Sequence, residues 1–389
     1  MKTFLTGGLI LTPATRLTDS ALEIENGIIQ RILRIDEIQL EQDCEIIHTD
    51  GYIITPGLID IHVHGSNRAD TMQASYEAFN TMSLFFARHG VTSFLATTVT
   101  ANEEDIYRTL EAIAAHQDAM QGANLLGAHL EGPFLNINHK GAQAPQHLRI
   151  AGRDEYARWF RIGGVKLITI APELDGSREL IAYGLSNGAE FAIGHSGASY
   201  EQVIQAADLG VRQATHTYNG MQGMNHREPG TAGGVLTDDR IYAQIIADGI
   251  HVHPAMIKLL VRAKGIERTI LITDAIQATG MEDGEYLLGD MQVTVKDSVA
   301  RIANGSLAGS TLTLDVALRN MMVFTGLDFQ DIVRMATIIP AQAMHIADKK
   351  GCIQPGADAD LTIFDEQHCV AATLVKGKIV FEKENLERS

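Results

Sequence analysis

The sequence predicts an α/β fold, a (β/α)8 barrel of the TIM type with a small β-sandwich domain built from both termini. Through the middle of the chain, short apolar runs alternate with stretches long enough for helices, and both ends alternate like β-structure. The apolar runs also end beside polar residues, and the C-terminal ends of barrel strands meet at the rim where active sites lie. The eight predicted strands end near His64, Thr98, Glu131, Glu173, His195, Asn219, Asp248 and Asp274.

Both ends of the chain are predicted to form the small β-sandwich. Within residues 1–52, the pair Asn26-Gly27 separates two apolar runs, and Asn-Gly supplies the positive φ values of a type I′ hairpin turn. Residues 349–389 contain a second predicted hairpin, which turns at Lys376-Gly377. Neither segment is long enough to bury a core alone. We therefore expect the two to pair beside a barrel formed by residues 53–348.

Helical patterns fill the stretches between the predicted strands. Residues 76–89 form one such pattern, and Gly90 follows it in the position that suits the end of a helix. Residues 101–120 form another. After the eighth strand, a helix is predicted to open at Gly309, and further helix is predicted over residues 329–343.

The composition of the chain limits its partners. A net charge of −17 disfavours nucleic acids and anionic membranes, which are polyanions, yet it leaves room for a local basic pocket that binds a small anion. No run approaches the roughly 20 apolar residues of a membrane helix, and the first residues lack the apolar stretch of a signal peptide. The three cysteines are widely spaced and indicate no disulfide framework. We expect a cytoplasmic protein with neither a membrane nor a nucleic acid as partner.

The first predicted barrel strand carries two histidines. His62 and His64 are two residues apart, so both side chains point to the same face of the strand and can reach one metal ion. Two structural histidines are the alternative. Residues 55–60 precede the pair and Gly65 follows it, and this string resembles the opening signature of the amidohydrolase superfamily. The resemblance extends over the whole chain and favours the metal site.

Three more strand-end residues suit a metal. Glu131 precedes a Gly-Pro pair and could cap a turn, while His195 and His216 could each be structural. Together they form a three-ligand set with an open position, which is typical of catalytic zinc; iron, manganese and cobalt also fit. Many members of the superfamily bridge two metals with a carbamylated lysine, but no lysine ends a predicted strand and Lys166 begins one. Glu131 is the natural substitute, and with His62 and His64 the chain can hold one or two metals.

Asp274 follows the last predicted barrel strand. A carboxylate there could cap a helix, but beside a metal it serves as the general base. A bound metal lowers the pKa of water towards neutrality, and a nearby carboxylate takes the proton and later passes it to the leaving group. The superfamily resemblance implies this role for Asp274.

Several loops resemble those of one family in particular, the N-acetylglucosamine-6-phosphate deacetylases. The strings that carry this finer resemblance are residues 130–135, 140–143, 216–221, 226–230, 248–254 and 307–310. The resemblance implies a homodimer and a small amino-sugar phosphate as substrate. It also implies a set of substrate-binding residues, namely Ala142, Gln143, Asn219, Gly220, Arg227, His251, Leu307, Ala308 and Gly309.

Two of these residues need comment. Arg227 has the fork of donors that suits a phosphate, and in this family it is the candidate to reach across a dimer interface; a surface salt bridge with Glu228 is the alternative. Some family members have histidine where this chain has Gln143. Glutamine still donates and accepts hydrogen bonds, so contact with the sugar can persist, but cationic help to the phosphate or carbonyl is lost.

The function implied is metal-dependent hydrolysis of N-acetylglucosamine 6-phosphate to glucosamine 6-phosphate and acetate, with metal-bound hydroxide as nucleophile and Asp274 as base and then acid. A deaminase or cyclic amidase on the same scaffold is an alternative, but Arg227 and His251 favour a phosphorylated substrate. A non-catalytic relative that binds an amino-sugar phosphate is a second alternative. Its mark would be a missing ligand or acid, and neither is missing.

Overall fold

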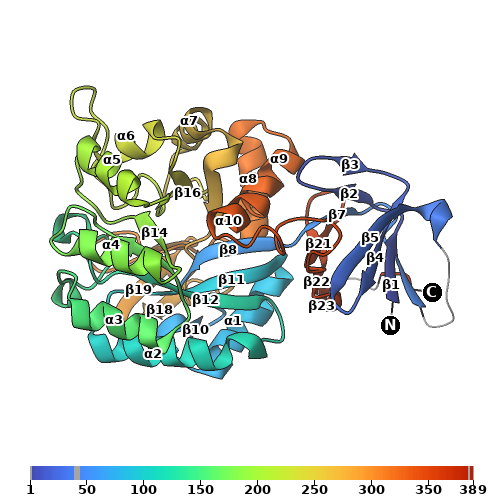
Figure 1. The fold of residues 1–389 in the computed structure, drawn as a ribbon, viewed down its shortest axis with the longest axis horizontal. Helices are drawn as coiled ribbons and strands as arrows, with labels where there is room; N and C mark the ends of the chain where they lie inside the picture. The colour runs from blue at the N-terminus through green and yellow to red at the C-terminus, as the bar shows by residue number, and fades with distance from the viewer. Residues whose placement is uncertain (1, 39–43, 384–385, 389) are drawn as a thin grey trace.

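The computed structural model describes residues 2–38, 44–383 and 386–388 and contains a parallel eight-stranded sheet that curls into a barrel (Figure 1). The strands follow one another in chain order, and the last returns to the first where the backbone N–H of Asp274 donates to the carbonyl of His62 at 3.0 Å. The predicted fold class is confirmed. The barrel strands are β8 (Leu58–Val63), β11 (Val91–Thr98), β12 (Asn124–Glu131), β13 (Val165–Ile170), β14 (Glu190–Ile193), β15 (Gln213–Ala214), β16 (Tyr242–Ile246) and β17 (Thr269–Ile272).

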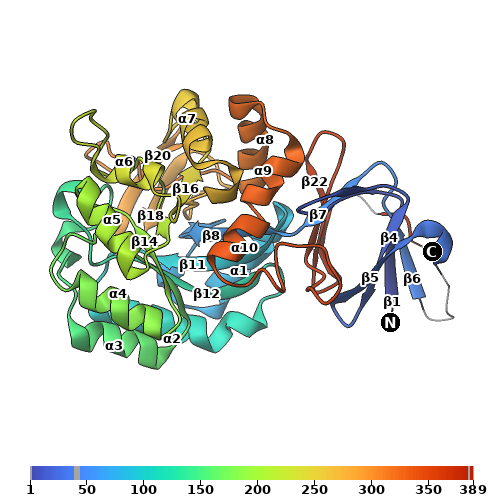
Figure 2. The same cartoon turned by 45° about the horizontal axis from the view of Figure 1, so that its top comes forward.

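Helices surround the barrel and cover its outer face (Figures 1 and 2). Because both faces of the barrel sheet are covered, strands such as β8 and β11 are buried at every residue rather than at alternate residues. The helices are α1 (Tyr76–Arg88), α2 (Glu103–His116), α3 (Arg153–Ile162), α4 (Ser177–Ser186), α5 (Tyr200–Leu209), α6 (Gly230–Thr237), α7 (Pro254–Lys264), α8 (Leu314–Thr325), α9 (Phe329–Met335) and α10 (Ile338–Ala343).

The predicted helices need three corrections. The helix expected over residues 101–120 is shorter, because the side chain of Asn102 accepts from Asp105 N and starts α2 at the next residue. The helix expected to open at Gly309 begins at Leu314 instead. Gly309 has a φ of +57°, which no right-handed helix admits. The helical stretch 329–343 is divided into α9 and α10.

Two sheets form the small domain beside the barrel (Figure 1). The first contains only N-terminal strands, and the second combines strands from both ends of the chain. Their shared core includes Leu22 from the first sheet and Leu361 from the second. In sheet order, the first contains β5 (Ile28–Arg34), β4 (Ser20–Glu25), β1 (Lys2–Thr6) and β6 (Cys44–His48). The second contains β23 (Lys378–Glu382), β22 (Val370–Val375), β21 (Leu361–Phe364), β7 (Ile53–Pro56), β2 (Leu9–Leu11) and β3 (Arg16–Leu17).

Both predicted hairpin turns are present. Asn26 and Gly27 join β4 to β5 with φ values of 53° and 79°, and Lys376 and Gly377 join β22 to β23 with 48° and 72°. The domain limits at residues 52 and 348 stay predictions. Strand β7 continues the mixed sheet past the first limit, and residues 1, 39–43, 384–385 and 389 of the predicted small domain lie outside the described residues.

A further β-element follows the last barrel strand. The antiparallel strands β18 (Gly284–Leu288), β19 (Met291–Lys296) and β20 (Val299–Arg301) have a core of their own that includes Val293 and Ala308. A short pair, β9 (Gly65–Ser66) and β10 (Ala69–Asp70), follows β8. Among the described residues, none of the helices has the length and apolarity needed to cross a bilayer.

Candidate metal centre and substrate cavity

A cavity of about 290 Å³ opens at the C-terminal rim of the barrel. It brings together most of the residues that the sequence predicted for the site, although they come from loops far apart in the chain. His62 lies below the cavity and is fully buried, and Ala308 is also buried. The lining residues are His64, Glu131, Gly141, Ala142, Gln143, His195, His216, Asn219, Gly220, His251, Asp274, Leu288, Ser306, Leu307 and Gly309.

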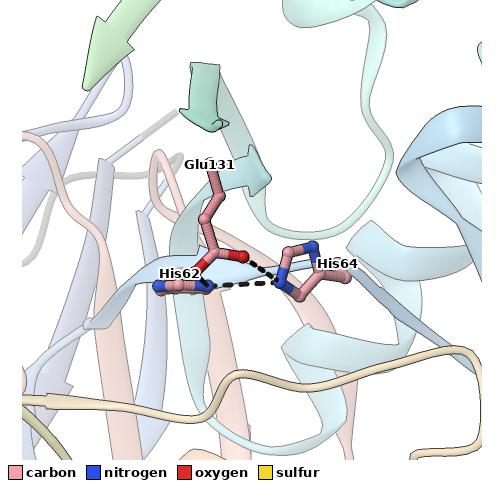
Figure 3. Close-up of side chains that lie close together, drawn as sticks. All are labelled: His62, His64 and Glu131. Carbon is pink, nitrogen blue, oxygen red and sulfur yellow. Dashed lines mark hydrogen bonds and ion pairs between the residues drawn. The ribbon is translucent and has the colours of Figure 1, made fainter. Parts of the chain in front are cut away.

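The first group of metal-binding side chains consists of His62, His64 and Glu131 (Figure 3). His62 lies on β8 and His64 directly follows that strand, and their Nε2 atoms lie 3.2 Å apart. Glu131 ends β12 and directs its carboxylate at both: Oε1 is 3.6 Å from Nε2 of His62, and Oε2 is 3.3 Å from Nε2 of His64. All three side chains are buried, and the i, i+2 spacing of the histidines directs both imidazoles to the same side of the chain.

Glu131 also belongs to a second group, with His195 and His216. Its Oε1 atom lies 3.2 Å from Nε2 of His195 and 2.9 Å from Nε2 of His216. The two imidazole Nε2 atoms are 3.1 Å apart. The carboxylate of Glu131 therefore stands between the two groups, with Oε1 facing the second group and Oε2 facing His64.

The hydrogen bonds of the outer nitrogens test whether these histidines suit a cation. Nδ1 of His195 donates to the carbonyl of His139 at 2.8 Å, Nδ1 of His216 to the carbonyl of Asn219 at 3.1 Å, and Nδ1 of His64 to the carbonyl of Thr97 at 3.2 Å. A neutral histidine with its proton on Nδ1 presents a lone pair at Nε2. Nitrogen lone pairs 3.1 Å apart repel unless a cation lies between them, so the donor set fits a divalent metal.

The local backbone turns the three last functional side chains inwards. His195, His216 and Asp274 each lie two residues after a short strand, and each has a positive φ, of 48°, 29° and 54° respectively. Non-glycine residues rarely adopt such values, and each costs of order 1–3 kcal/mol. The surrounding barrel holds this strain at the three positions where the chemistry needs it.

Asp274 completes the centre. Its Oδ1 atom lies 3.4 Å from Nε2 of His62 and 3.2 Å from Nε2 of His64. Burial alone would raise the pKa of Asp274, but the two histidines outweigh burial and lower its pKa to about 2. Asp274 is therefore an ionised carboxylate at neutral pH and is able to accept a proton.

In the metal-free chain, His64 carries the compensating positive charge. Burial lowers the pKa of His64, but the carboxylates of Asp274 and Glu131 raise it by more than burial lowers it. The pKa of His64 therefore reaches about 10. Burial lowers the pKa of His62 to about 4, which leaves this histidine neutral. A metal held by His62, His64 and Glu131 must displace the proton of His64.

Known proteins resemble this chain over nearly its whole length. A sequence model of the amidohydrolase family matches residues 53–380. The chain belongs to the amidohydrolase family. The N-acetylglucosamine-6-phosphate deacetylase of Vibrio furnissii is 39% identical over 361 residues, which cover 92% of this chain and 90% of the relative. The N-acetylgalactosamine-6-phosphate deacetylase of Escherichia coli O157:H7 is 36% identical over 373 residues, covering 95% of this chain and 97% of the relative.

A solved structure agrees with the fold of this amidohydrolase. A mutant of the N-acetyl-D-glucosamine-6-phosphate deacetylase of Mycobacterium smegmatis, in complex with N-acetyl-D-glucosamine-6-phosphate, superposes with a TM-score of 0.91 at 32% identity. The match covers 97% of this chain and 99% of that chain. The predicted resemblance to the N-acetylglucosamine-6-phosphate deacetylases is confirmed.

His251 reaches the cavity of this amidohydrolase from the loop after β16. Its Nδ1 is bonded to Oδ2 of Asp248 at 2.6 Å, and Asp248 also accepts from the backbone N–H groups of Ile250 and His251. Burial raises the pKa of Asp248, but the bond to His251 outweighs burial, and the net pKa is lowered. Asp248 therefore orients His251 and leaves its Nε2 for a ligand. His253, two residues further on, is exposed and caps α7 by accepting from Ala255 N.

Arg227 is absent from the lining of the cavity. Arg227 is exposed in the loop that leads into α6. This loop extends outwards from the barrel (Figure 2). The salt bridge to Glu228 that was the alternative for Arg227 is not formed: within residues 44–383, no ion pair involves this guanidinium, and its backbone N–H donates to Asn225 Oδ1 at 3.1 Å. Arg227 therefore does not contribute to the cavity of its own chain in this structure.

Sequence reasoning missed the role of Glu173, which it treated only as a strand end. Oε1 of Glu173 accepts from Asn136 Nδ2 at 2.9 Å and from Gly197 N at 2.6 Å, and Oε2 accepts from Ser196 Oγ at 2.7 Å. This carboxylate joins the loop after β12 to the residues that follow His195. No pattern in the sequence pairs Glu173 with those loops, because the contacts depend on neighbouring strands.

His129 and Asp60 support the centre from below. Nε2 of His129 is bonded to Thr169 Oγ1 at 2.7 Å, and the His129 ring packs edge-on against His62 with centroids 4.7 Å apart. Asp60 accepts from Thr273 Oγ1 at 2.6 Å, one residue before the predicted base. Asp60 lies two residues before His62 on the same strand face, so the i, i+2 pattern could have identified it.

Proposed function

We propose that this amidohydrolase removes the acetyl group from N-acetylglucosamine 6-phosphate and releases glucosamine 6-phosphate and acetate. The observation that carries the proposal is the centre itself: three histidines, Glu131 and the ionised Asp274 line one cavity, and His62 lies directly beneath them. Relatives that are 39% identical over most of the chain are named for this reaction.

Glu131, His195 and His216 would hold the main cation, and His62 and His64 offer a second position that shares Glu131. We propose zinc, because carboxylate oxygen and imidazole nitrogen suit it; iron, manganese or cobalt would also fit. Once bound, the cation lowers the pKa of water and polarises the acetamide carbonyl.

Asp274 would move the proton. As the water oxygen bonds to the carbonyl carbon, Asp274 takes a proton from the water, and its lowered pKa ensures that it starts ionised. When the C–N bond breaks, Asp274 returns the proton to the amine nitrogen of the sugar. The products are then acetate and the free amino sugar.

The remaining predicted residues would hold the sugar phosphate. Five of them are in or beside the cavity, namely His251, Ala142, Asn219, Leu307 and Gly309. Gln143 has one amide hydrogen left for the sugar. The wall of the cavity is shaped by Gly220 and Ala308. Arg227 would bind the phosphate of a substrate held by a second copy, which makes the functional unit a homodimer. A cytoplasmic setting without nucleic acid or membrane partners suits the net charge of −17.

The N-acetylgalactosamine 6-phosphate isomer is the second candidate substrate, because a relative named for its deacetylation is 36% identical over 95% of this chain. The test is kcat/KM for the two phosphorylated sugars and for unphosphorylated N-acetylglucosamine. We expect the glucosamine isomer to be preferred and the unphosphorylated sugar to be poor. A preference for the galactosamine isomer would make that isomer the substrate. Equal kcat/KM for N-acetylglucosamine with and without its 6-phosphate would remove the role given to Arg227.

A further inference from the structure

Gln143 contacts a metal-binding side chain directly. Its Nε2 donates to Oε2 of Glu131 at 2.7 Å, and its Oε1 accepts from the backbone N–H of Thr100 at 2.8 Å. Because a backbone N–H can only donate, this second bond fixes which end of the amide is oxygen. The NH2 group must therefore face Glu131, and the side chain is only 5% exposed.

The bond from Gln143 settles how the carboxylate of Glu131 is turned. Oε1 faces His195 and His216, at 3.2 and 2.9 Å, whereas Oε2 receives the amide hydrogen. The terminal torsion of a glutamate is broad, so a carboxylate without such a bond samples many orientations. A hydrogen bond to an ionised acceptor is short and strong enough to select one of them.

The position of Gln143 is itself set by a neighbouring strand. Thr100 lies two residues after β11, and Glu131 ends the adjacent strand β12. Gln143 joins the two strand ends, and its own backbone N–H donates to the carbonyl of Lys140 at 2.9 Å. The chain of contacts therefore runs from the barrel through Gln143 to the metal-binding carboxylate.

We propose that Gln143 is a positioning residue that orients Glu131 for metal binding, in addition to any contact with the sugar. The inference rests on the proposed metal-dependent function. Gln143 acts through Glu131. Its hydrogen bond keeps Oε1 of Glu131 directed at His195 and His216, and Oε2 keeps a second lone pair that faces His64. The sequence had suggested only a contact between Gln143 and the sugar.

The test is the affinity for zinc, measured by competition with a chromogenic chelator. Gln143→Met has similar length but no donor, and Gln143→Ala opens the position to water from the cavity. We expect both variants to bind zinc about 10- to 100-fold more weakly than wild type and to change the visible absorption spectrum of the cobalt-loaded protein. Gln146→Met and Gln146→Ala, at an exposed residue of the same loop, are the matched controls and should bind zinc like wild type.

Weaker zinc binding with an unchanged melting temperature of the metal-free protein supports the inference. Wild-type affinity in both variants, with only a raised KM, would show that Gln143 is a substrate contact alone and would overturn it. A fall in the metal-free melting temperature large enough to account for the loss of affinity would also overturn it. If the Met variant does not fold, the Ala variant decides. Zinc binding needs no turnover, so a wild-type protein that binds zinc but releases no acetate would refute the proposed function alone.

Discussion

Gly220 lies against the imidazole of His195, and a Cβ atom at Gly220 would stand 2.8 Å from Nδ1 of His195. The same Cβ would lie 3.1 Å from the carbonyl of His139, which is the acceptor for that nitrogen. Gly220 also has a φ of +60°. The absence of a side chain at Gly220 makes room for the hydrogen bond that orients His195.

Gly220→Ala should therefore damage the metal centre. The new methyl group must displace His195 or its carbonyl partner, and the positive φ adds strain. We expect zinc bound per chain to fall and turnover to drop at least about tenfold. Gly223→Ala, at an exposed position of the same loop with open space around it, is the control. Normal zinc content in Gly220→Ala would contradict this role.

Asp274→Asn should abolish most turnover while the protein still folds. Asparagine keeps the shape of the side chain but cannot accept the proton, and general base catalysis typically contributes about 10²- to 10⁴-fold. Initial rates and a far-UV circular dichroism spectrum of the same preparation test both parts. An Asn variant with near-normal kcat would remove Asp274 from the reaction.

The affinity for a metal held by His62, His64 and Glu131 should increase with pH. The carboxylates of Asp274 and Glu131 raise the pKa of His64 to about 10 despite its burial, so in the metal-free chain this histidine is protonated at neutral pH. A metal needs the unprotonated Nε2, and one displaced proton makes affinity rise about tenfold per pH unit below that pKa. Calorimetric titrations with a metal between pH 6 and pH 8, in buffers of different ionisation enthalpy, would measure the released proton. Affinity independent of pH would show that His64 does not take part in binding.

Glu173→Ala should loosen the loop that carries His139. The substitution removes three hydrogen bonds, from Asn136, Ser196 and Gly197, and with them the connection between this loop and the residues after His195. We expect faster amide hydrogen exchange in residues 136–139 and kcat lower by about tenfold. Glu179→Ala, at an exposed site on α4, should change neither. Unchanged exchange in the loop would refute the link.

Arg227→Ala should raise KM for a phosphorylated substrate by about ten- to hundredfold, since a charge-assisted bond to the phosphate is lost. Mixed dimers test whether the arginine acts across an interface. At a substrate concentration well below the raised KM, Arg227→Ala chains turn over little substrate because they bind it poorly, and Asp274→Asn chains turn over little because they lack the base. If Arg227 serves the partner, mixing them should restore roughly a quarter of wild-type activity, because half of the dimers then hold one intact site. No recovery on mixing would place Arg227 elsewhere.

Much of the centre was predictable because barrel strands deliver their ends to one rim. The i, i+2 spacing of His62 and His64 and the strand-end positions of Glu131, His195 and Asp274 suffice to bring these residues together. The contacts of Gln143 and Glu173 were not predictable, since each joins loops that follow different strands. Whether Arg227 serves its own chain or a partner was not predictable either, because the sequence of a loop does not determine the direction in which the loop leaves the barrel.

The most direct test of the account is acetate release from N-acetylglucosamine 6-phosphate by protein stripped of metal and then titrated with zinc. The stripped protein should be inactive, and activity should rise with bound zinc and saturate at one or two ions per chain, the capacity that the two ligand groups sharing Glu131 allow. Full acetate release by protein shown to contain no metal would contradict the central claim. So would the absence of release from protein shown to hold zinc at both groups.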